Sequence, residues 1–173
     1  EIRNDYFAYD QKVYENLHNL RGRILRSEDL QKNENEIKNL EKEITVFHAK
    51  IINKIIGSTE KKIDFIGFHG QTIYHNPSEK ISKQIGDGNL LSQLTQKIVV
   101  YNFRQNDIKN GGEGAPLTPI FHSLIIKQEK IKLPICILNI GGIANATLIR
   151  KEYKENNFLS RDLGPGNCLI DEW

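Results

Sequence analysis

Two glycine-rich elements near the end of the sequence contain the residue types that phosphoryl transfer uses. The first is Leu138–Asn145, which reads LNIGGIAN, and the second is Asp162–Asn167, which reads DLGPGN. An apolar strand that runs into a Gly-Gly turn lets backbone N–H groups approach a phosphate closely, and an aspartate before a glycine turn offers a base or a ligand for metal-bound water. An isolated Gly-Gly pair is more typical of a hairpin turn that needs positive φ. Because the two elements occur together, we interpret them as parts of a phosphoryl-transfer site.

Polar side chains are also dense in one short segment near the middle of the sequence. They are His69, Gln71, Thr72 and His75, which follow an apolar run. Neutral imidazole, amide and hydroxyl groups at this spacing suit hydrogen bonding to a polyol or a sugar. The alternative is a turn in which the histidine only forms hydrogen bonds with neighbouring groups of the protein. The segment alone does not decide between the two interpretations.

A third polar segment places Arg104 and Asp107 before a loop with glycines at 111, 112 and 114. The bare backbone of such a loop leaves room for a ligand. Arg104 is able to clamp a carboxylate through two parallel hydrogen bonds, or to form an ion pair with Asp107 that only orders the loop. Both interpretations stay open. The histidines are too dispersed to form a metal site of nitrogen and sulfur ligands.

The elements that must position these residues begin with helices. From Ile37 to Ile55 the apolar residues keep the three-and-four spacing of one helix face, and Gly57-Ser58 ends the run. The segment Tyr14–Leu25 is also predicted to be helical, with a break around Gly22 or at Ser27–Asp29. The charged residues of these helices are interpreted as a solvated face.

After Lys61 the pattern changes to alternating strands and helices, which indicates the α/β class. Asp87 is expected to cap a helix that carries Leu90, Leu91 and Leu94, and Pro116 to lie in the first turn of another helix. A further helix is expected near Asn167. The predicted strands are Ile63–Gly67, Ile81–Ile85, a buried Ile98–Phe103, Pro134–Ile140, its hairpin partner Ala144–Ile149, and Phe158–Leu163.

The composition is typical of a soluble globular protein, with 173 residues, 38% hydrophobic, 27% charged and a formal net charge of +2. No apolar run is long enough to span a membrane and no signal-peptide pattern opens the sequence, so a cytoplasmic location is expected. Nucleic-acid binding is not indicated, because the lysines are scattered. Cys136 and Cys168 are interpreted as buried thiols. Since the sequence has no methionine and stops just after the predicted start of a helix, we expect it to be a fragment.

Several motifs of this sequence, in the same order and at similar spacing, resemble those of the anhydro-N-acetylmuramic acid kinase family. The resemblance runs from about Ile63 to Trp173 and involves separate blocks, which makes chance an unsatisfactory explanation. The blocks are Gly67–Thr72, Gln84–Asp87, Asn102–Arg104 with Asp107, Gly111–Leu117, Leu138–Asn145 and Asp162–Asn167.

The resemblance implies an α/β fold of the actin, hexokinase and sugar-kinase superfamily, that is, a partial actin-like and ribonuclease-H-like sugar kinase fold with a helical N-terminal region. Residues 1–132 would be the later part of the first actin-like domain, with a helical region at 1–60 and a sugar-facing α/β part at 61–132. Residues 133–173 would begin the second domain, with the phosphate turn and the catalytic aspartate. The resemblance also implies ATP and Mg²⁺ as cofactors and leaves a homodimer open.

The activity implied by the resemblance opens 1,6-anhydro-N-acetylmuramic acid with water and phosphorylates its 6-oxygen, in the recycling of peptidoglycan. Asp162 would be the general base that activates the water, since an aspartate is ionised at neutral pH. Gly141, Gly142, Asn145, Gly164 and Gly166 would lie on the nucleotide side, near the transferred phosphoryl group. The residues implied on the sugar side are His69, Gln71, Thr72, Arg104 and Asp107, and no residue is implied as a metal ligand.

The sequence departs from the family pattern in places. The phosphate loop that opens family members and their glycine-rich adenine-binding region do not appear, Arg161 replaces a phenylalanine, and Leu163 stands where a small or polar residue is common. An alternative is therefore a non-catalytic nucleotide- or sugar-binding remnant of the superfamily. A sugar hydrolase without ATP is disfavoured, because it needs a second positioned carboxylate and has no use for the Gly-Gly turn.

Overall fold

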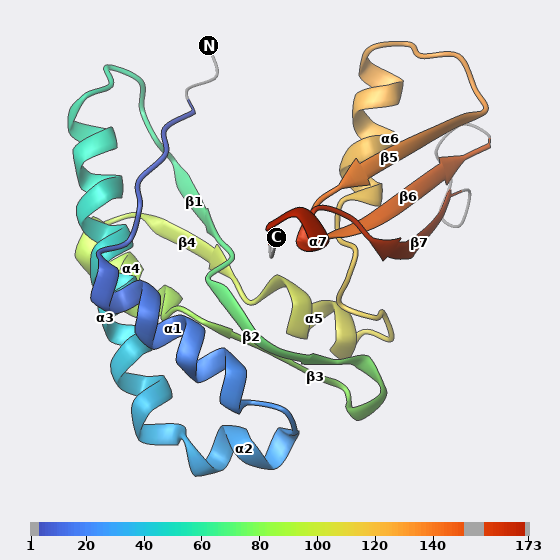
Figure 1. Ribbon diagram of the computed structural model, residues 1–173. Helices are drawn as coiled ribbons and strands as arrows, with labels where there is room; N and C mark the ends of the chain where they lie inside the picture. The colour runs from blue at the N-terminus through green and yellow to red at the C-terminus, as the bar shows by residue number, and fades with distance from the viewer. Residues whose placement is uncertain (1–3, 151–157, 172–173) are drawn as a thin grey trace. The chain divides into compact units, whose positions relative to one another are not determined.

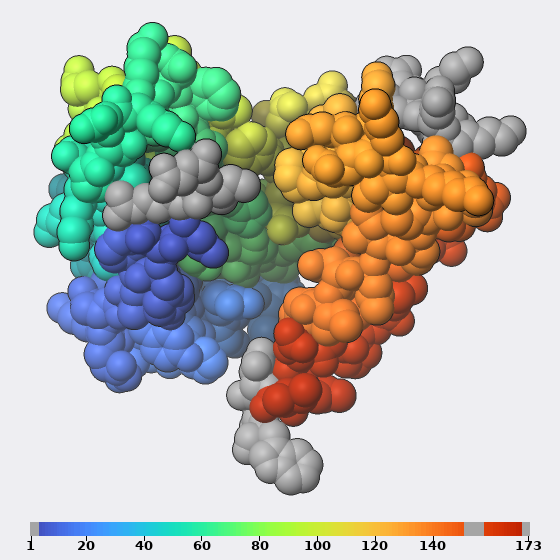
Figure 2. Space-filling view, turned by 90° about the horizontal axis from the view of Figure 1, so that it is seen from above, coloured from blue at the N-terminus to red at the C-terminus, as the bar shows by residue number. Residues whose placement is uncertain are grey.

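The computed structural model describes residues 4–150 and 158–171, and the chain divides into two compact units (Figure 1). Unit 1 ends at Gly114 and unit 2 begins at Ala115. In the space-filling view each unit is a continuous packed body (Figure 2). The predicted boundary between residues 132 and 133 concerns the domains of a complete sugar kinase fold, and it stays a prediction. Each unit is described by itself below.

Unit 1 opens with three helices, α1 (Gln11–Arg23), α2 (Ser27–Lys32) and α3 (Glu34–Gly57). The Asp10 carboxylate accepts the Val13 N–H at 2.9 Å, which caps α1. The carboxylate of Asp29 accepts the backbone N–H groups of Leu25 and Arg26 at the start of α2. Helix α3 confirms the long amphipathic helix expected from residue 37. The break predicted at Ser27–Asp29 lies between α1 and α2, where Asp29 accepts these two hydrogen bonds.

Two pairs of strands complete the core of unit 1. Strands β1 (Phe65–Phe68) and β4 (Ile98–Tyr101) are parallel, and β2 (Gln71–Asn76) and β3 (Ile81–Ile85) are antiparallel around the short helix η1 (Pro77–Glu79). Helix α4 (Gly88–Thr95) is capped by Asp87 as predicted, and α5 (Phe103–Lys109) follows β4. The larger buried cluster comprises Val13, Leu17, Leu20, Ile24, Ile37, Leu40, Ile44, Ile73, Tyr74 and Ile85.

Strand β2 is not among the strands predicted from the sequence. Its register against β3 shifts between Thr72 and Tyr74, so that Ile73 is an extra residue and both Ile73 and Tyr74 are buried. This irregularity breaks the alternation of period two that would have marked a strand. The mixed helix and strand content places the chain in the α/β class, as expected.

The expectation that residues 98–103 form one buried strand is wrong. The side chains of Ile98 and Val100 are 69% and 46% exposed, and within the described part of the chain β4 pairs only with β1, in a sheet of two strands. The strand also ends at Tyr101, because Asn102 adopts the left-handed conformation (φ 62°) and Phe103 begins α5. The apolar run thus continues across the boundary between β4 and α5, and its hydropathy does not show where that boundary lies.

Unit 2 is an antiparallel sheet with a helix on one face. Helix α6 (Pro119–Gln128) begins at Pro119 rather than near Pro116, and strands β5 (Ile135–Ile140), β6 (Ile143–Ile149) and β7 (Phe158–Pro165) lie in the order β5-β6-β7, before α7 (Cys168–Asp171). The predicted hairpin and third strand are confirmed.

The two thiols are not buried, contrary to expectation. Cys136 is exposed and Cys168 is half-buried, and both are free. Cys136 pairs across the sheet with Leu148 and therefore lies on the face opposite Thr147 and α6. An apolar flanking sequence indicates that a strand forms, but not which face of its sheet is covered.

Candidate functional site

The two glycine-rich elements of unit 2 are joined directly by hydrogen bonds. Gly141 and Gly142 form the turn between β5 and β6, and the second element returns to this turn after β7. The N–H of Gly166 donates to the carbonyl of Gly142 at 2.8 Å, and the N–H of Asn167 donates to the carbonyl of Gly141 at 2.7 Å. The side-chain amide of Asn167 also donates to the carbonyl of Ile140, at 3.2 Å. Two motifs that are separate in the sequence are thus one structural element.

The glycines of this element serve different purposes. A Cβ on Gly166 would lie 2.2 Å from the carbonyl oxygen of Gly141, so the close approach of the two backbones requires glycine there. In contrast, a Cβ on Gly142 would meet no atom within 4 Å, and neither Gly141 nor Gly142 has positive φ. The alternative interpretation, a hairpin turn that needs positive φ, therefore does not account for the Gly-Gly pair. Its backbone is open to an approaching group.

Asp162 lies on β7 directly across from Asn145 on β6, and Asn145 in turn pairs with Asn139 on β5. Cross-strand partners project from the same face of a sheet, so these polar residues share one face. The register shifts next to this pair, where Leu163 is the extra residue of a β-bulge. Bulges re-aim neighbouring side chains and are common beside active sites. The exposed Asp162 therefore stands at a distorted point of the strand, close to the glycine turn.

The same face carries a buried polar network next to Asp162 and Asn145. The Oγ1 of Thr147, which is fully buried, lies 3.1 Å from Nδ1 of His122 on α6 and 3.2 Å from Oγ of Ser160. Helix α6 covers the sheet at this point, and Thr147 and Ser160 are each two residues along their strand from Asn145 and Asp162. The Oδ1 atom of Asn145 is buried without a hydrogen-bond partner among the described residues. Such an atom is an acceptor that a ligand or ion is able to use.

Arg161, which replaces a phenylalanine of the family pattern, lies on the opposite face. It pairs with Ala146, whereas Asp162 pairs with Asn145. Because successive residues of a strand point to opposite faces, the Arg161 side chain is directed away from the Asp162 carboxylate. Leu163 is the residue that alters the local course of the strand.

In unit 1, Arg104 and Asp107 together hold the glycine loop that follows them. The guanidinium of Arg104 donates to the carbonyl of Gly114 at 2.9 Å, and the carboxylate of Asp107 accepts the N–H of the same glycine at 2.8 Å. A Cβ on Gly112 would lie 2.1 Å from Oδ2 of Asp107, so the loop also packs closely on this carboxylate. Both side chains therefore order the loop through separate hydrogen bonds to Gly114.

His69 uses both of its ring nitrogens inside unit 1. Its Nε2 accepts a hydrogen bond from Nε of Arg104 at 2.9 Å, and its Nδ1 lies 2.9 Å from the carbonyl of Gly70. Since a guanidinium only donates and a carbonyl only accepts, the imidazole is assigned as neutral with its proton on Nδ1. His69 is therefore a link between the strand end and Arg104, and it offers no spare ring nitrogen in this arrangement.

The other polar residues of the His69 segment point in different directions. Nε2 of Gln71 donates to the hydroxyl of Tyr9 at 3.1 Å, and Thr72 accepts from Nε2 of Gln84 at 3.3 Å. Burial raises the pKa of Tyr9, and the hydrogen bond from Gln71 opposes this increase. Thr72 lines a hollow together with His18 and Arg21, whereas His69 lines another pocket. The structure thus divides the predicted sugar-side residues instead of gathering them around one cavity.

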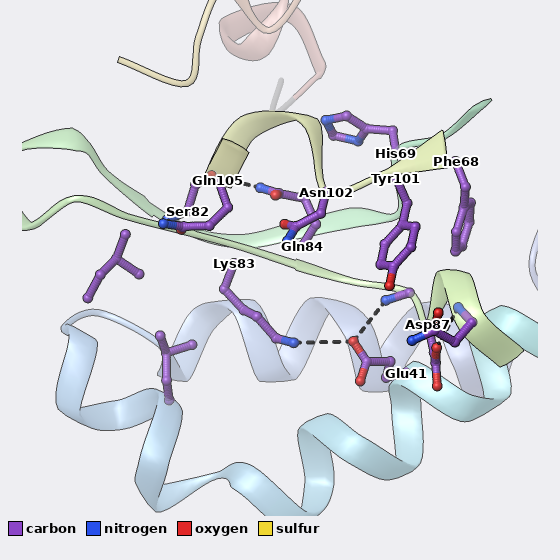
Figure 3. Close-up of a pocket in the computed structure, with 14 residues that line it drawn as sticks. Glu41, Phe68, His69, Ser82, Lys83, Gln84, Asp87, Tyr101, Asn102 and Gln105 are labelled. Atoms are coloured by element: carbon purple, nitrogen blue, oxygen red, sulfur yellow. Dashed lines mark hydrogen bonds and ion pairs between the residues drawn. The ribbon is translucent and has the colours of Figure 1, made fainter. Parts of the chain in front are cut away.

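The pocket that includes His69, here called the unit 1 pocket, has a volume of about 420 Å³. Figure 3 shows strand β3 between two groups of these residues, with Lys83 and Glu41 on the side of α3 and with Gln84, Asn102 and Gln105 on the other side of the strand. Nζ of Lys83 and the N–H of Gly86 both donate to Oε1 of Glu41, at 3.2 and 3.1 Å. The lining residues are Leu30, Glu41, Phe68, His69, Ile81, Ser82, Lys83, Gln84, Gly86, Asp87, Asn89, Tyr101, Asn102 and Gln105.

Sequence reasoning missed most of these pocket residues as candidates. Gln84, Asp87 and Asn102 belong to motif blocks of the sequence, so their pattern carried a signal that was not assigned to a ligand. Glu41 lies among many charged residues of α3 and had no such signal. Among the residues that the structure describes, no group of three or more His, Cys, Asp or Glu side chains is arranged to hold a metal ion. In the same described part of the chain, no helix is long and apolar enough to cross a membrane.

Comparison with known proteins shows which family the sequence matches. A family model described as anhydro-N-acetylmuramic acid kinase matches residues 4–173. A protein of that name from Pelagibacter ubique is 60% identical over 172 residues, which cover 99% of this chain and 46% of the relative. Relatives of the same name from Methylobacterium nodulans and Rhizobium etli are 44% and 40% identical, over 79% and 88% of this chain and 37% and 44% of their own lengths. The chain spans about half the length, or less, of the curated relatives it matches.

Proposed function

This chain belongs to the anhydro-N-acetylmuramic acid kinase family, and from that premise we propose that it is part of an ATP-dependent kinase. The kinase would open 1,6-anhydro-N-acetylmuramic acid with water and phosphorylate the freed 6-oxygen, as a step of cell-wall recycling and amino sugar metabolism. The observation that carries this proposal is the hydrogen-bonded union of the two glycine elements, with Asp162 on the adjacent strand. A base for water and an open backbone for a phosphoryl group are two of the parts that this reaction needs.

Asp162 is assigned as the general base. Its carboxylate takes a proton from water, the water oxygen bonds to the anomeric carbon, and the bond from that carbon to the 6-oxygen breaks. The 6-oxygen then attacks the γ-phosphorus of ATP, and ADP leaves. Exposure of Asp162 next to a bulge makes its carboxylate accessible to a bound water.

The phosphoryl side of the site is assigned to the glycine turn. Backbone N–H groups around Gly141 and Gly142 would face the transferred phosphoryl group, and a Cβ built on Gly142 would meet no atom of the described residues within 4 Å. Gly166 brings the second element against this turn, and Gly164 pairs with Ala144 on the adjacent strand. Asn145, with its unpartnered amide oxygen, completes this side.

Mg²⁺ is proposed as a cofactor that neutralises the charge of the phosphates. This ion prefers oxygen ligands and is usually held by one or two carboxylates together with substrate phosphates. On this side of the site the unpartnered Oδ1 of Asn145 would be an oxygen ligand, and the phosphates and water would supply the others. No larger cluster of protein ligands is needed.

On the sugar side we propose that Arg104, Asp107 and His69 act by shaping the loop at Gly111–Gly114 for the substrate. Their hydrogen bonds to Gly114 and to each other support a positioning role. Gln71 and Thr72 would support the strand that follows. A cytoplasmic location agrees with the need for ATP, and a homodimer is a further proposal that sedimentation measurements would test.

The direct test is a chimera in which this chain replaces the matching segment of the Pelagibacter ubique relative, 60% identical to it. Release of ADP from ATP and Mg²⁺ should then depend on the anhydro sugar. A chimera that folds and binds ATP but releases no ADP with the sugar would contradict the proposal, and it would favour a non-catalytic binding remnant instead.

A further inference from the structure

The unit 1 pocket has the charge of a site for a neutral polar group rather than for a phosphate. Glu41 and Asp87 carry negative charges, and Lys83 is the one Lys or Arg among the lining residues that the structure describes. Lys83 is already paired with Glu41, at 3.2 Å. A phosphate in this pocket would therefore lie near the Asp87 carboxylate without a free cation to compensate. Hydroxyl and amide groups are uncharged, so the Asp87 carboxylate would not repel them in this way.

The walls of the pocket match the chemistry of a sugar. The rings of Phe68 and Tyr101 provide apolar surface, and Gln84, Asn102 and Gln105 provide amides. Pockets of about 300–1,000 Å³ with apolar walls and a few placed polar groups are typical of small-molecule sites. A volume of about 420 Å³ lies within that range.

Most polar groups of the pocket are already used by the fold. Oε1 of Gln105 accepts the N–H of Ser82 at 2.9 Å, and Oδ1 of Asp87 accepts two N–H groups at the start of α4, at 2.9 and 3.0 Å. Two amide groups differ from these. Oε1 of Gln84 is buried and has no partner among the described residues, and the Asn102 side chain makes no capping hydrogen bond to α5.

Asn102 also has an unusual backbone. Its φ of 62° and ψ of 34° lie in the left-handed region, which asparagine tolerates better than most residues but glycine adopts without strain. Such residues cluster at ligand sites when the surrounding fold holds them in place. The conformation turns the chain from β4 into α5 and leaves the amide of Asn102 at the pocket.

We propose that the unit 1 pocket recognises the acetamido group of the amino sugar, with Gln84 and Asn102 as the hydrogen-bonding residues. An acetamido group carries one N–H donor and one carbonyl acceptor. Oε1 of Gln84 would accept the N–H, and Nδ2 of Asn102 would donate to the carbonyl. The inference rests on the proposed function for the identity of the sugar, and it assigns to this pocket the part of that sugar that does not react.

The test uses Asn102→Gly in the chimera, because glycine keeps the left-handed backbone and removes the side chain that carries the amide. KM for the anhydro sugar should rise about five- to tenfold, the factor expected for one hydrogen bond, with kcat and KM for ATP almost unchanged. The increase should shrink for an analogue that lacks the acetyl group. Gln96→Gly is the matched control, since Gln96 is exposed, has φ of 54° and lies outside the pocket, and its KM should not change.

An unchanged KM for the sugar in Asn102→Gly, or an equal increase for the analogue without the acetyl group, would overturn the pocket assignment while sugar-dependent ADP release keeps the proposed function. If the chimera does not turn over, the proposed function fails and the pocket is tested separately. Titration of the ¹⁵N-labelled 173-residue chain with the anhydro sugar should then shift the side-chain amide resonances of Gln84 and Asn102. Absence of these shifts at millimolar sugar would refute the assignment.

Discussion

At the scale of single residues, the side chains of the two candidate sites differ in how far the fold already uses them. The carboxylate of Asp162 is exposed on a sheet face beside a bulge, and Asn145 across from it keeps an unpartnered oxygen. In contrast, His69, Arg104 and Asp107 are all engaged in hydrogen bonds within unit 1. A side chain that is accessible is suited to react with a substrate. A side chain whose polar atoms already form hydrogen bonds within the protein is suited to hold other groups in position.

Asp162→Asn in the chimera should lower kcat by about 10²–10⁴-fold, the usual contribution of a positioned base. Nucleotide binding should stay nearly intact, because the amide preserves the shape of the side chain. ADP release and the ATP affinity measured by calorimetry check both parts. Arg161→Gln is the control on the opposite face of β7 and should retain turnover. Retained turnover with lost ATP affinity in Asp162→Asn would contradict the assigned role.

Tyr9 gives a pH prediction, because burial raises its pKa from the ordinary value of 10.0. The folded state therefore keeps its proton at a pH where the unfolded chain has lost it. The stability contribution is complete below about pH 10 and is lost as the pH rises through the folded pKa. Urea unfolding at pH 8 and pH 11 should show a larger loss of stability for the native chain than for Tyr9→Phe. An equal loss in both would show that Tyr9 is not the responsible group.

At the scale of elements, the glycine turn and the strand that returns to it act as one unit. Gly166 permits the contact and Gly142 leaves the surface open, although the two residues look alike in the sequence. Substitution separates these roles. Gly166→Ala places a methyl group against the carbonyl of Gly141 and should destabilise the chain by about 1–3 kcal/mol, as for other overpacked sites.

Gly142→Ala is the matched variant and should change the free energy of unfolding by less than about 0.5 kcal/mol, since the new methyl group meets no neighbour. Its effect should appear instead as reduced turnover of the chimera, because the methyl group occupies the surface that the phosphoryl group approaches. Urea unfolding and ADP release distinguish the two effects. Equal destabilisation of both variants would mean that the turn is not packed as described.

At the scale of the whole molecule, unit 2 exposes much apolar surface. On the sheet face opposite Thr147, the side chains of Leu138, Ile140 and Leu159 are 55%, 57% and 51% exposed. Patches of this kind mark interaction surfaces or sites of aggregation. We expect the isolated chain to self-associate, and Leu138→Ser combined with Leu159→Ser to reduce this. Sedimentation velocity checks the prediction, and unchanged association in the double variant would contradict it.

The isolated chain should also turn over weakly or not at all, since it matches less than half the length of its Pelagibacter ubique relative. Joining it to the rest of that relative should restore turnover. The comparison of isolated chain and chimera at equal concentration, by ADP release, is the measurement. Robust turnover of the isolated chain would show that the additional segments are dispensable.

The sequence by itself determined the order and type of most elements. The apolar stripe of α3, the Asp87 cap and the hairpin around Gly141-Gly142 depend on local patterns, which short-range physics sets. The six motif blocks were likewise enough to indicate the family that the family model also matches.

Only the tertiary structure decided which faces are covered and which groups meet. The exposure of β4 and Cys136, the bulges at Ile73 and Leu163, and the hydrogen bonds between the glycine elements all depend on partners far away in the sequence. A strand has the same local pattern whether or not a helix covers its far side, and a bulge shows only when two registers are compared. For the same reason, the pairing of Asp162 with Asn145 had to be read from the sheet.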